Sequence, residues 1–150
     1  MTFEAFIKIY VVDMQNRIRR HTWQTKNSII EHKLMPYFKD KKMSDITPKD
    51  VIQWQNEMIA YRDAKGKAFS PVYLKTLHNQ LSAILNHAVR YYELKSNPAA
   101  KAGNMGMEKT KEMLFWTKDE YLKFSDAMMD KPVSFYAFEM LYWCGVRLSD

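Results

Sequence analysis

The chain has 150 residues, with 23 Lys+Arg against 17 Asp+Glu, a formal net charge of +6 and a single cysteine. Its longest apolar runs are only a few residues, far below the roughly 20 that span a bilayer, which excludes a membrane-spanning helix. The lone Cys144 excludes an internal disulfide and a multi-cysteine zinc site. The N-terminal stretch has no signal-peptide pattern, so we expect a cytoplasmic protein without membrane contact.

The positive charge is unevenly distributed along the chain. Residues 1–107 hold 17 Lys+Arg and 9 Asp+Glu, a net of +8, whereas residues 108–150 hold 6 and 8, a net of −2. A small basic domain is a candidate for binding a polyanion, because each phosphate that Lys or Arg neutralises releases counterions. Solvated surface lysine is the alternative interpretation of the same excess.

Helical spacing of apolar residues begins the chain. From Phe3 to Ile18 the pattern predicts a first helix, which ends in a basic cluster at residues 17–21. Thr22 is the expected N-cap of a second helix. Pro36 should bend or end that helix, since proline removes a backbone donor.

Two further helices have stronger start signals. Thr47–Asp50 supplies an N-cap, a proline at the first helical position and an acid at the third. Ser70-Pro71 repeats this opening, and an apolar seam from Leu74 to Tyr92 continues for about five turns. Asn97-Pro98 should close that helix. Residues 1–103 therefore predict a four-helix bundle.

Residues 104–112 are predicted to be a linker, followed by a second, mostly helical region. The apolar run at 113–116 suits a strand or an entry segment, and Thr117–Glu120 is a capping box that opens a helix. A last helix, about Val133 to Trp143, is apolar nearly all round and needs burial on more than one side. Residues 113–150 are too few to surround it, so we expect this domain to be cut short.

The polar face of the long helix carries the candidate binding residues. Lysine and arginine can hold phosphates, while asparagine and histidine can reach base edges in a major groove. One side of the second helix carries a similar but less regular set of basic and polar residues. The candidates are Lys75, Asn79, Ser82, Asn86 and Arg90 with His78 beside them, and Lys26 and Lys33 on the second helix. The competing interpretation is that these residues form the solvent-exposed face of an amphipathic helix and bind nothing.

Motifs for metals, nucleotides or cofactors are missing from the sequence, and the four histidines lack metal-ligand spacing, so no metal and no cofactor is expected. Near the end of the chain, Gly145 can turn the backbone sharply. Arg147 would then lie at the N-terminus of a new helix whose N-cap is Ser149 or Asp150. The planar guanidinium group of an arginine can donate two parallel hydrogen bonds to a phosphate. On the residues alone, a surface arginine is the simpler interpretation.

The order of these blocks resembles the tyrosine recombinase (phage-type integrase) family over nearly the whole chain. The terminal Gly145–Asp150 looks like the first conserved box of the catalytic domain, with Arg147 at its catalytic arginine. Asp150 stands where the family more often has Glu, in a supporting role. The other matching blocks are Thr22-Trp23, Pro36–Phe38, Met43–Val51 with Trp54, Ser70 through Ala99, and Trp116–Glu120.

This resemblance implies an all-α fold, with a four-helix SAM-like core-binding domain at 1–103, a linker at 104–112 and the truncated start of the catalytic domain at 113–150. Family members cut and rejoin DNA without cofactors: a tyrosine attacks the scissile phosphate and forms a 3′-phosphotyrosyl link. Of the catalytic groups only the first arginine is present here, so the resemblance predicts an inactive piece of a DNA recombinase from a mobile element.

Double-stranded DNA and other recombinase protomers are the partners that the resemblance implies, with the second and fourth helices toward the major groove. An alternative is a non-enzymatic helical interaction module that meets proteins through exposed C-terminal aromatics. A small repressor-like regulator would need a recognisable helix-turn-helix, for which the sequence gives no support.

Overall fold

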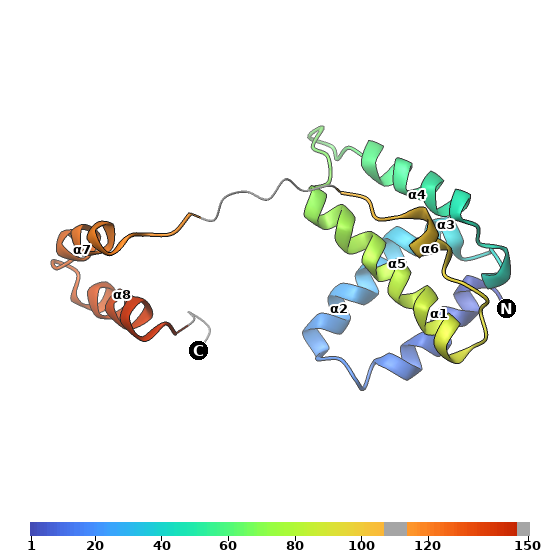
Figure 1. Ribbon diagram of the computed structural model, residues 1–150, viewed down its shortest axis with the longest axis horizontal. Helices are drawn as coiled ribbons and strands as arrows, with labels where there is room; N and C mark the ends of the chain where they lie inside the picture. The colour runs from blue at the N-terminus through green and yellow to red at the C-terminus, as the bar shows by residue number, and fades with distance from the viewer. Residues whose placement is uncertain (107–113, 147–150) are drawn as a thin grey trace. The chain divides into compact units, whose positions relative to one another are not determined.

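The computed structural model describes residues 1–106 and 114–146, which belong to two units, Met1–Lys109 and Thr110–Asp150. Within these ranges the regular structure is helical, with no strand and only two isolated bridges, Thr2–Lys42 and Arg62–Ala68. The all-α prediction is therefore confirmed (Figure 1).

The first two helices are α1 (Phe3–Met14) and α2 (Arg20–Ile29). Both differ from the sequence prediction at the loop between them, because α1 ends before Ile18 and α2 begins before Thr22. The backbone nitrogen of Trp23 already donates to the Arg19 carbonyl over 3.0 Å, so the first turn of α2 is closed without help from Thr22. The expected N-cap at Thr22 is wrong.

A π-helical segment, η1 (Ile30–Leu34), joins α2 to the short α3 (Met35–Phe38). The backbone nitrogen of Met35 donates to the carbonyl of Ile30, five residues back. Pro36 has no N–H to donate and its ring crowds the preceding turn, so a widened turn lets the helix continue through it. The indole Nε1 of Trp54 donates to the Lys33 carbonyl over 2.9 Å and fixes the widened turn to the core.

The remaining helices of the first unit begin at capped prolines, after the 3₁₀ turn η2 (Met43–Asp45). They are α4 (Pro48–Ala60), α5 (Pro71–Tyr91) and α6 (Pro98–Ala102). Thr47 and Asp50 form the predicted capping box of α4, and the hydroxyl of Ser70 caps α5. The structure confirms both predicted starts.

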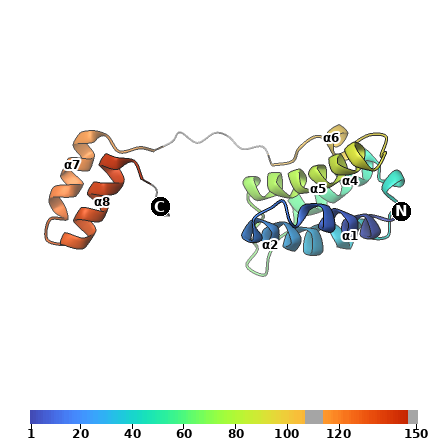
Figure 2. The same cartoon turned by 90° about the horizontal axis from the view of Figure 1, so that it is seen from below.

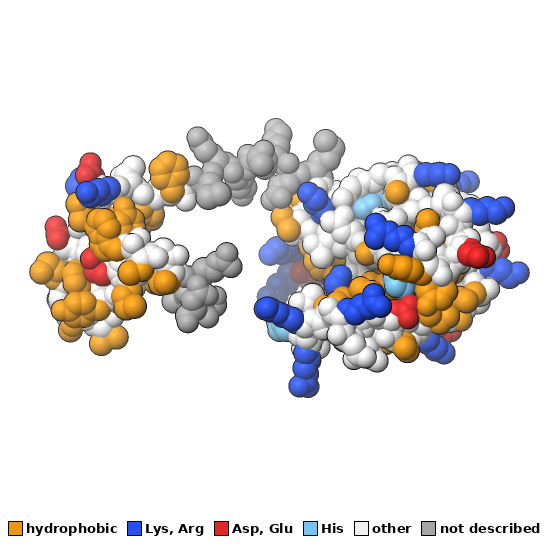
Figure 3. Space-filling view, turned by 60° about the horizontal axis from the view of Figure 1, so that its bottom comes forward, with side chains coloured by type: hydrophobic (Ala, Val, Ile, Leu, Met, Phe, Trp, Pro, Cys, Tyr) orange, Lys and Arg blue, Asp and Glu red, His pale blue; other side chains and the backbone are white. Residues whose placement is uncertain are grey.

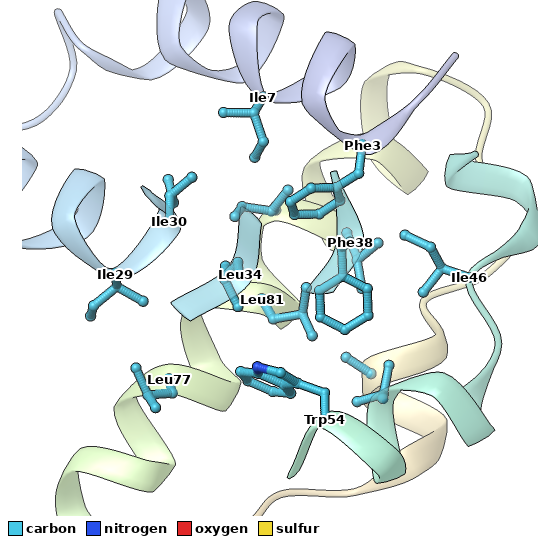
Figure 4. Close-up of a cluster of buried hydrophobic side chains, with 14 of the residues drawn as sticks. Phe3, Ile7, Ile29, Ile30, Leu34, Phe38, Ile46, Trp54, Leu77 and Leu81 are labelled. Atoms are coloured by element: carbon cyan, nitrogen blue, oxygen red, sulfur yellow. The ribbon is translucent and has the colours of Figure 1, made fainter. Parts of the chain in front are cut away.

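Helix α5 is the centre of this unit and contacts α1, α2, α4 and α6 (Figures 1 and 2). Its leucine seam packs on aromatic side chains from the other helices, including Phe3, Phe38 and Trp54 (Figure 4). Leu77 and Leu81 are fully buried there. Because the seam occupies one side of α5, its polar side faces outward.

The second unit is a pair of helices, α7 (Lys118–Ala127) and α8 (Pro132–Cys144). The predicted capping box of Thr117 and Glu120 starts α7, and residues 114–116 are an irregular lead-in, not a strand. The rings of Tyr121 and Tyr142 stack at 3.6 Å and hold the two helices together. As expected for an apolar helix with one neighbour, α8 has no buried residue.

None of the helices in residues 1–106 and 114–146 is both long and apolar enough to cross a membrane.

Candidate nucleic-acid interface

Helix α5 brings most of its predicted polar residues to one exposed side. Four of them have exposed side chains, and Ser82 is half-buried. A spacing of three or four residues repeats on one face of a 3.6-residue helix, so their alignment follows from the sequence. We call the four exposed residues the α5 face: Lys75, Asn79, Asn86 and Arg90.

The segment after α5 returns along this helix and borders the α5 face, which the sequence did not predict. The side-chain amide of Asn97 donates to Ser82 Oγ over 3.0 Å and to Asn86 Oδ1 over 2.9 Å. Further along, Asn104 Nδ2 donates to Asn79 Oδ1 over 3.1 Å. Three of the predicted binding residues therefore also form hydrogen bonds that attach the segment after α5 to this helix.

Gly106 completes this return at the start of α5. Its φ of +82° lies in the left-handed region, and a Cβ there would meet the Pro71 carbonyl oxygen at 2.2 Å. Only glycine fits so close an approach. The preceding Met105 is buried, so the segment is part of the packed unit up to this point.

His78 differs from its prediction as a base-contacting residue. The side chain is only 4% exposed, and its Nδ1 lies 3.0 Å from the Gln55 amide nitrogen, which also donates to the Gly103 carbonyl over 2.7 Å. Burial lowers the pKa of the imidazole. Position 78 lies on the side of the stripe nearest the leucine seam, so the side chain packs between α4 and α5 instead of reaching outward.

The two lysines predicted on the second helix are partly engaged within the protein. Lys26 Nζ donates to Gln80 Oε1 over 2.9 Å and links α2 to α5. The Lys33 ammonium lies 4.8 Å from the centre of the Phe69 ring and 5.0 Å from that of Tyr61, and these two rings stack. Each ammonium has three donors, so both lysines keep donors for a further partner.

The electrostatic contrast between the units is visible on their surfaces. Figure 3 shows Lys and Arg side chains spread over the first unit and hydrophobic side chains dominating the second. The ion pairs of Lys and Arg among the described residues are Lys39–Asp40 and Lys41–Asp50, and His87 Nε2 lies 2.8 Å from Asp13. None involves Lys75 or Arg90, so both keep their charge for an outside partner.

Arg147 and Asp150 lie outside the described residues, and their predicted roles remain predictions. Gly145, just before them, ends α8 in the left-handed conformation with φ of 62°, as a C-terminal glycine is expected to do. In residues 1–106 and 114–146 no group of three His, Cys, Asp or Glu side chains could hold a metal ion.

A family model described as "Phage integrase, N-terminal SAM-like domain" matches residues 2–59, which run from the start of α1 almost to the end of α4. Over this range, the chain is similar to the SAM-like N-terminal domain of phage integrases. The resemblance to tyrosine recombinases and the SAM-like helical fold, both predicted from sequence, are confirmed.

Three solved structures of lambda integrase share this fold, each with a TM-score of 0.61. A dimer of residues 75–356 bound to a COC′ core site is 24% identical and is matched over 89% of this chain and 45% of its own. A second dimer on a COC′ core site and a tetramer on a Holliday junction are each 23% identical over 88% of this chain, and the match covers 35% and 37% of their own chains. No curated protein sequence matches significantly.

This chain therefore spans less than half the length of the lambda integrase chains that it matches.

Proposed function

We propose that the first unit binds duplex DNA through the α5 face, as the core-binding part of a site-specific recombinase. The observation that carries this proposal is the α5 face itself: two cations and two amides, all exposed, on one side of a 21-residue helix. The unit that carries this helix also holds the positive charge of the chain. The lambda integrase structures on core-site DNA support the same partner for this fold.

The dimensions of the face suit a duplex. Lys75 and Arg90 are 15 positions apart along the helix, about 22 Å at 1.5 Å per residue. The major groove admits one α-helix, and cations at both ends of such a helix can contact the phosphates that border the groove. Lys26 and Lys33 on the neighbouring α2 and η1 would add backbone contacts with their remaining donors.

In the same proposal, the core-binding domain is the predicted 1–103 together with the packed residues 104–106, the rest of 104–112 is the linker, and 113–150 is the start of the catalytic domain. Arg147 contacts the scissile phosphate, with Asp150 in support, and the whole protein rejoins DNA through a 3′-phosphotyrosyl intermediate. Other protomers assemble with it on DNA in the cytoplasm. The match to lambda integrase across 88–89% of the chain supports this organisation.

Fluorescence anisotropy with a labelled duplex over a salt series tests the proposal. The affinity should fall linearly with the logarithm of salt concentration, with a slope of about −0.9 per phosphate contacted. Lys75→Glu combined with Asn79→Ala should weaken binding at least about tenfold. Lys49→Glu, an exposed charge reversal on α4, is the matched control. Salt-insensitive binding, or equal effects of the two variants, would contradict the assignment.

An interaction module is the second candidate function, favoured by the apolar surface of the second unit. Leu114, Phe115 and Val133 are 97%, 79% and 86% exposed, and an open groove between α7 and α8 is lined mainly by aromatic rings. Apolar association persists in high salt, whereas DNA binding does not. Light scattering in 1 M salt would reveal such self-association, and deleting residues 114–150 should abolish it.

A further inference from the structure

A second polar site lies beside the α5 face, in a pocket between α1 and the C-terminal half of α5. It has a volume of about 370 Å³, and its lining includes Arg17 from the turn after α1, Asn86 and Arg90 from the α5 face, and the rings of Tyr10, His87 and Tyr91. Small-molecule sites start at roughly 300 Å³. The pocket can therefore hold a phosphate together with part of the sugar that carries it.

The orientation of the Asn86 amide in this pocket follows from a chain of hydrogen bonds. The backbone nitrogens of Ala99 and Ala100 can only donate, so the atom of Asn97 that they contact at 2.8 and 3.2 Å is its oxygen. The other end of Asn97 is then the nitrogen, and the atom of Asn86 that it contacts is an acceptor, Oδ1. The amide nitrogen of Asn86 is left with both of its N–H groups.

The charged groups around the pocket are two arginines and one acid. Neither Arg17 nor Arg90 takes part in an ion pair among the described residues. Asp13, the nearby acid, accepts at one oxygen from Tyr92 Oη over 2.7 Å and lies 2.8 Å from His87 Nε2. The hydrogen bond from Tyr92, followed by that from His87, lowers the pKa of Asp13, and the charge of Arg17 contributes less. The carboxylate is thus held mainly by α5 and the residue after it.

We propose that Arg17, Asn86 and Arg90 together bind one phosphodiester of the DNA backbone. This proposal rests on the proposed function and adds a specific contact to it. Two guanidinium forks and an amide nitrogen present only donors, which matches phosphate oxygens. Reading an adenine edge would require Asn86 to accept as well as donate, and one of the two lone pairs of its oxygen is already taken by Asn97. The pocket positions the helix on DNA and does not read sequence.

Salt-dependent anisotropy of the full chain on duplex DNA tests this pocket with Arg17→Gln, Arg90→Gln and the double variant. One shared phosphate predicts that each single variant keeps nearly the full salt slope, because the other arginine still neutralises the phosphate, and that the double variant loses about 0.9. Affinity should fall at least about tenfold in each single variant. Lys49→Gln, an exposed charge removal on α4, is the control. A loss of about 1.8 in the double variant would overturn the shared phosphate.

Asn86→Asp is the sharpest single test, because it keeps an acceptor for Asn97 and replaces the free donor by a carboxylate oxygen. It should weaken DNA binding more than Asn86→Ala while keeping a thermal midpoint close to that of the wild type. The loss should be equal on two duplexes of unrelated sequence. A loss confined to one sequence would overturn the backbone assignment and indicate base reading.

The remaining outcomes separate this proposal from the proposed function. Wild-type chain that fails to bind duplex DNA would overturn both. Salt-dependent wild-type binding with an unchanged slope in the double variant of Arg17→Gln and Arg90→Gln would overturn the pocket alone. Inorganic phosphate, titrated at constant ionic strength, should displace DNA only weakly. Saturation of the Arg17 and Arg90 side-chain NMR signals below 1 mM phosphate would assign the pocket to the free anion instead.

Discussion

Asn97 donates its side-chain amide to Oδ1 of Asn86 across 2.9 Å, and so ties the segment after α5 to the last turns of that helix. The oxygen of the same amide accepts from two backbone nitrogens and caps α6. Asn97 is only 8% exposed. One buried side chain therefore both starts α6 and fixes it beside the α5 face.

Asn97→Ala should lower the free energy of unfolding by about 2 kcal/mol, because it removes a helix cap and leaves the partly buried acceptors of Ser82 and Asn86 without a donor. Urea unfolding followed by circular dichroism measures this. Asn104→Ala removes one exposed hydrogen bond of the same segment and should cost under about 0.5 kcal/mol. Equal effects of the two variants would show that Asn97 has no special role in the fold.

Helix starts are the part of this fold that the sequence predicts best. Thr47, Ser70 and Thr117 each accept from a backbone nitrogen three residues ahead, as predicted. An N-cap depends on three or four consecutive residues, so the sequence contains nearly all the information. Thr22 has the right chemistry, but the turn is already closed from Arg19.

Contacts between distant residues could not be predicted in the same way. His78 has the spacing of a surface residue, yet Gln55, 23 positions away, pairs with it in the interior. The return of residues 97–106 along α5 depends on Asn97, Asn104 and Gly106 meeting partners 11 or more positions away. Arg17 enters the candidate site only because α1 packs on α5, and no periodicity in the sequence indicates that.

His78 should make stability depend on pH near neutrality. Burial lowers its folded-state pKa below the ordinary 6.5, so the unfolded chain binds the proton more readily. The stabilising contribution is complete above about pH 6.5 and is lost as the pH falls toward the folded-state pKa. His78→Gln, which cannot titrate, should reduce the difference in unfolding free energy between pH 7.5 and pH 5. An unchanged difference would show that His78 is accessible to protons in the fold.

Asp50 should also make the stability depend on pH, but over a more acidic range than His78. The hydrogen bond from Lys41, with those from Thr47, lowers the pKa of the carboxyl from 3.8 to about 2. A carboxyl with a depressed pKa stabilises the fold above its unfolded pKa, and this contribution disappears between pH 3.8 and about 2. Acid titration of Asp50→Asn should lack that component, and Asp40→Asn, at an exposed acid, should match the wild type. An identical acid transition in Asp50→Asn would contradict the assignment.

Glu139 is the one charged residue of α8, and its carboxylate receives three side-chain hydrogen bonds. Its Oε1 accepts from Tyr121 over 2.8 Å and from Ser125 over 2.7 Å, and its Oε2 accepts from Trp143 over 2.9 Å. Desolvation, together with the adjacent Glu139, raises the pKa of Tyr121 from 10.0 to about 12.

A tyrosine with a raised pKa holds its proton longer in the fold than in the unfolded chain, so the second unit should lose stability as the pH rises from 10 toward 12. Absorbance at 295 nm of the wild type minus that of Tyr121→Phe should give a titration with a midpoint near 12. In Glu139→Gln the same difference curve should move toward pH 10, because the neighbouring negative charge is gone while the packing is largely kept. A wild-type midpoint near 10 would mean that Tyr121 and Glu139 are not paired in solution.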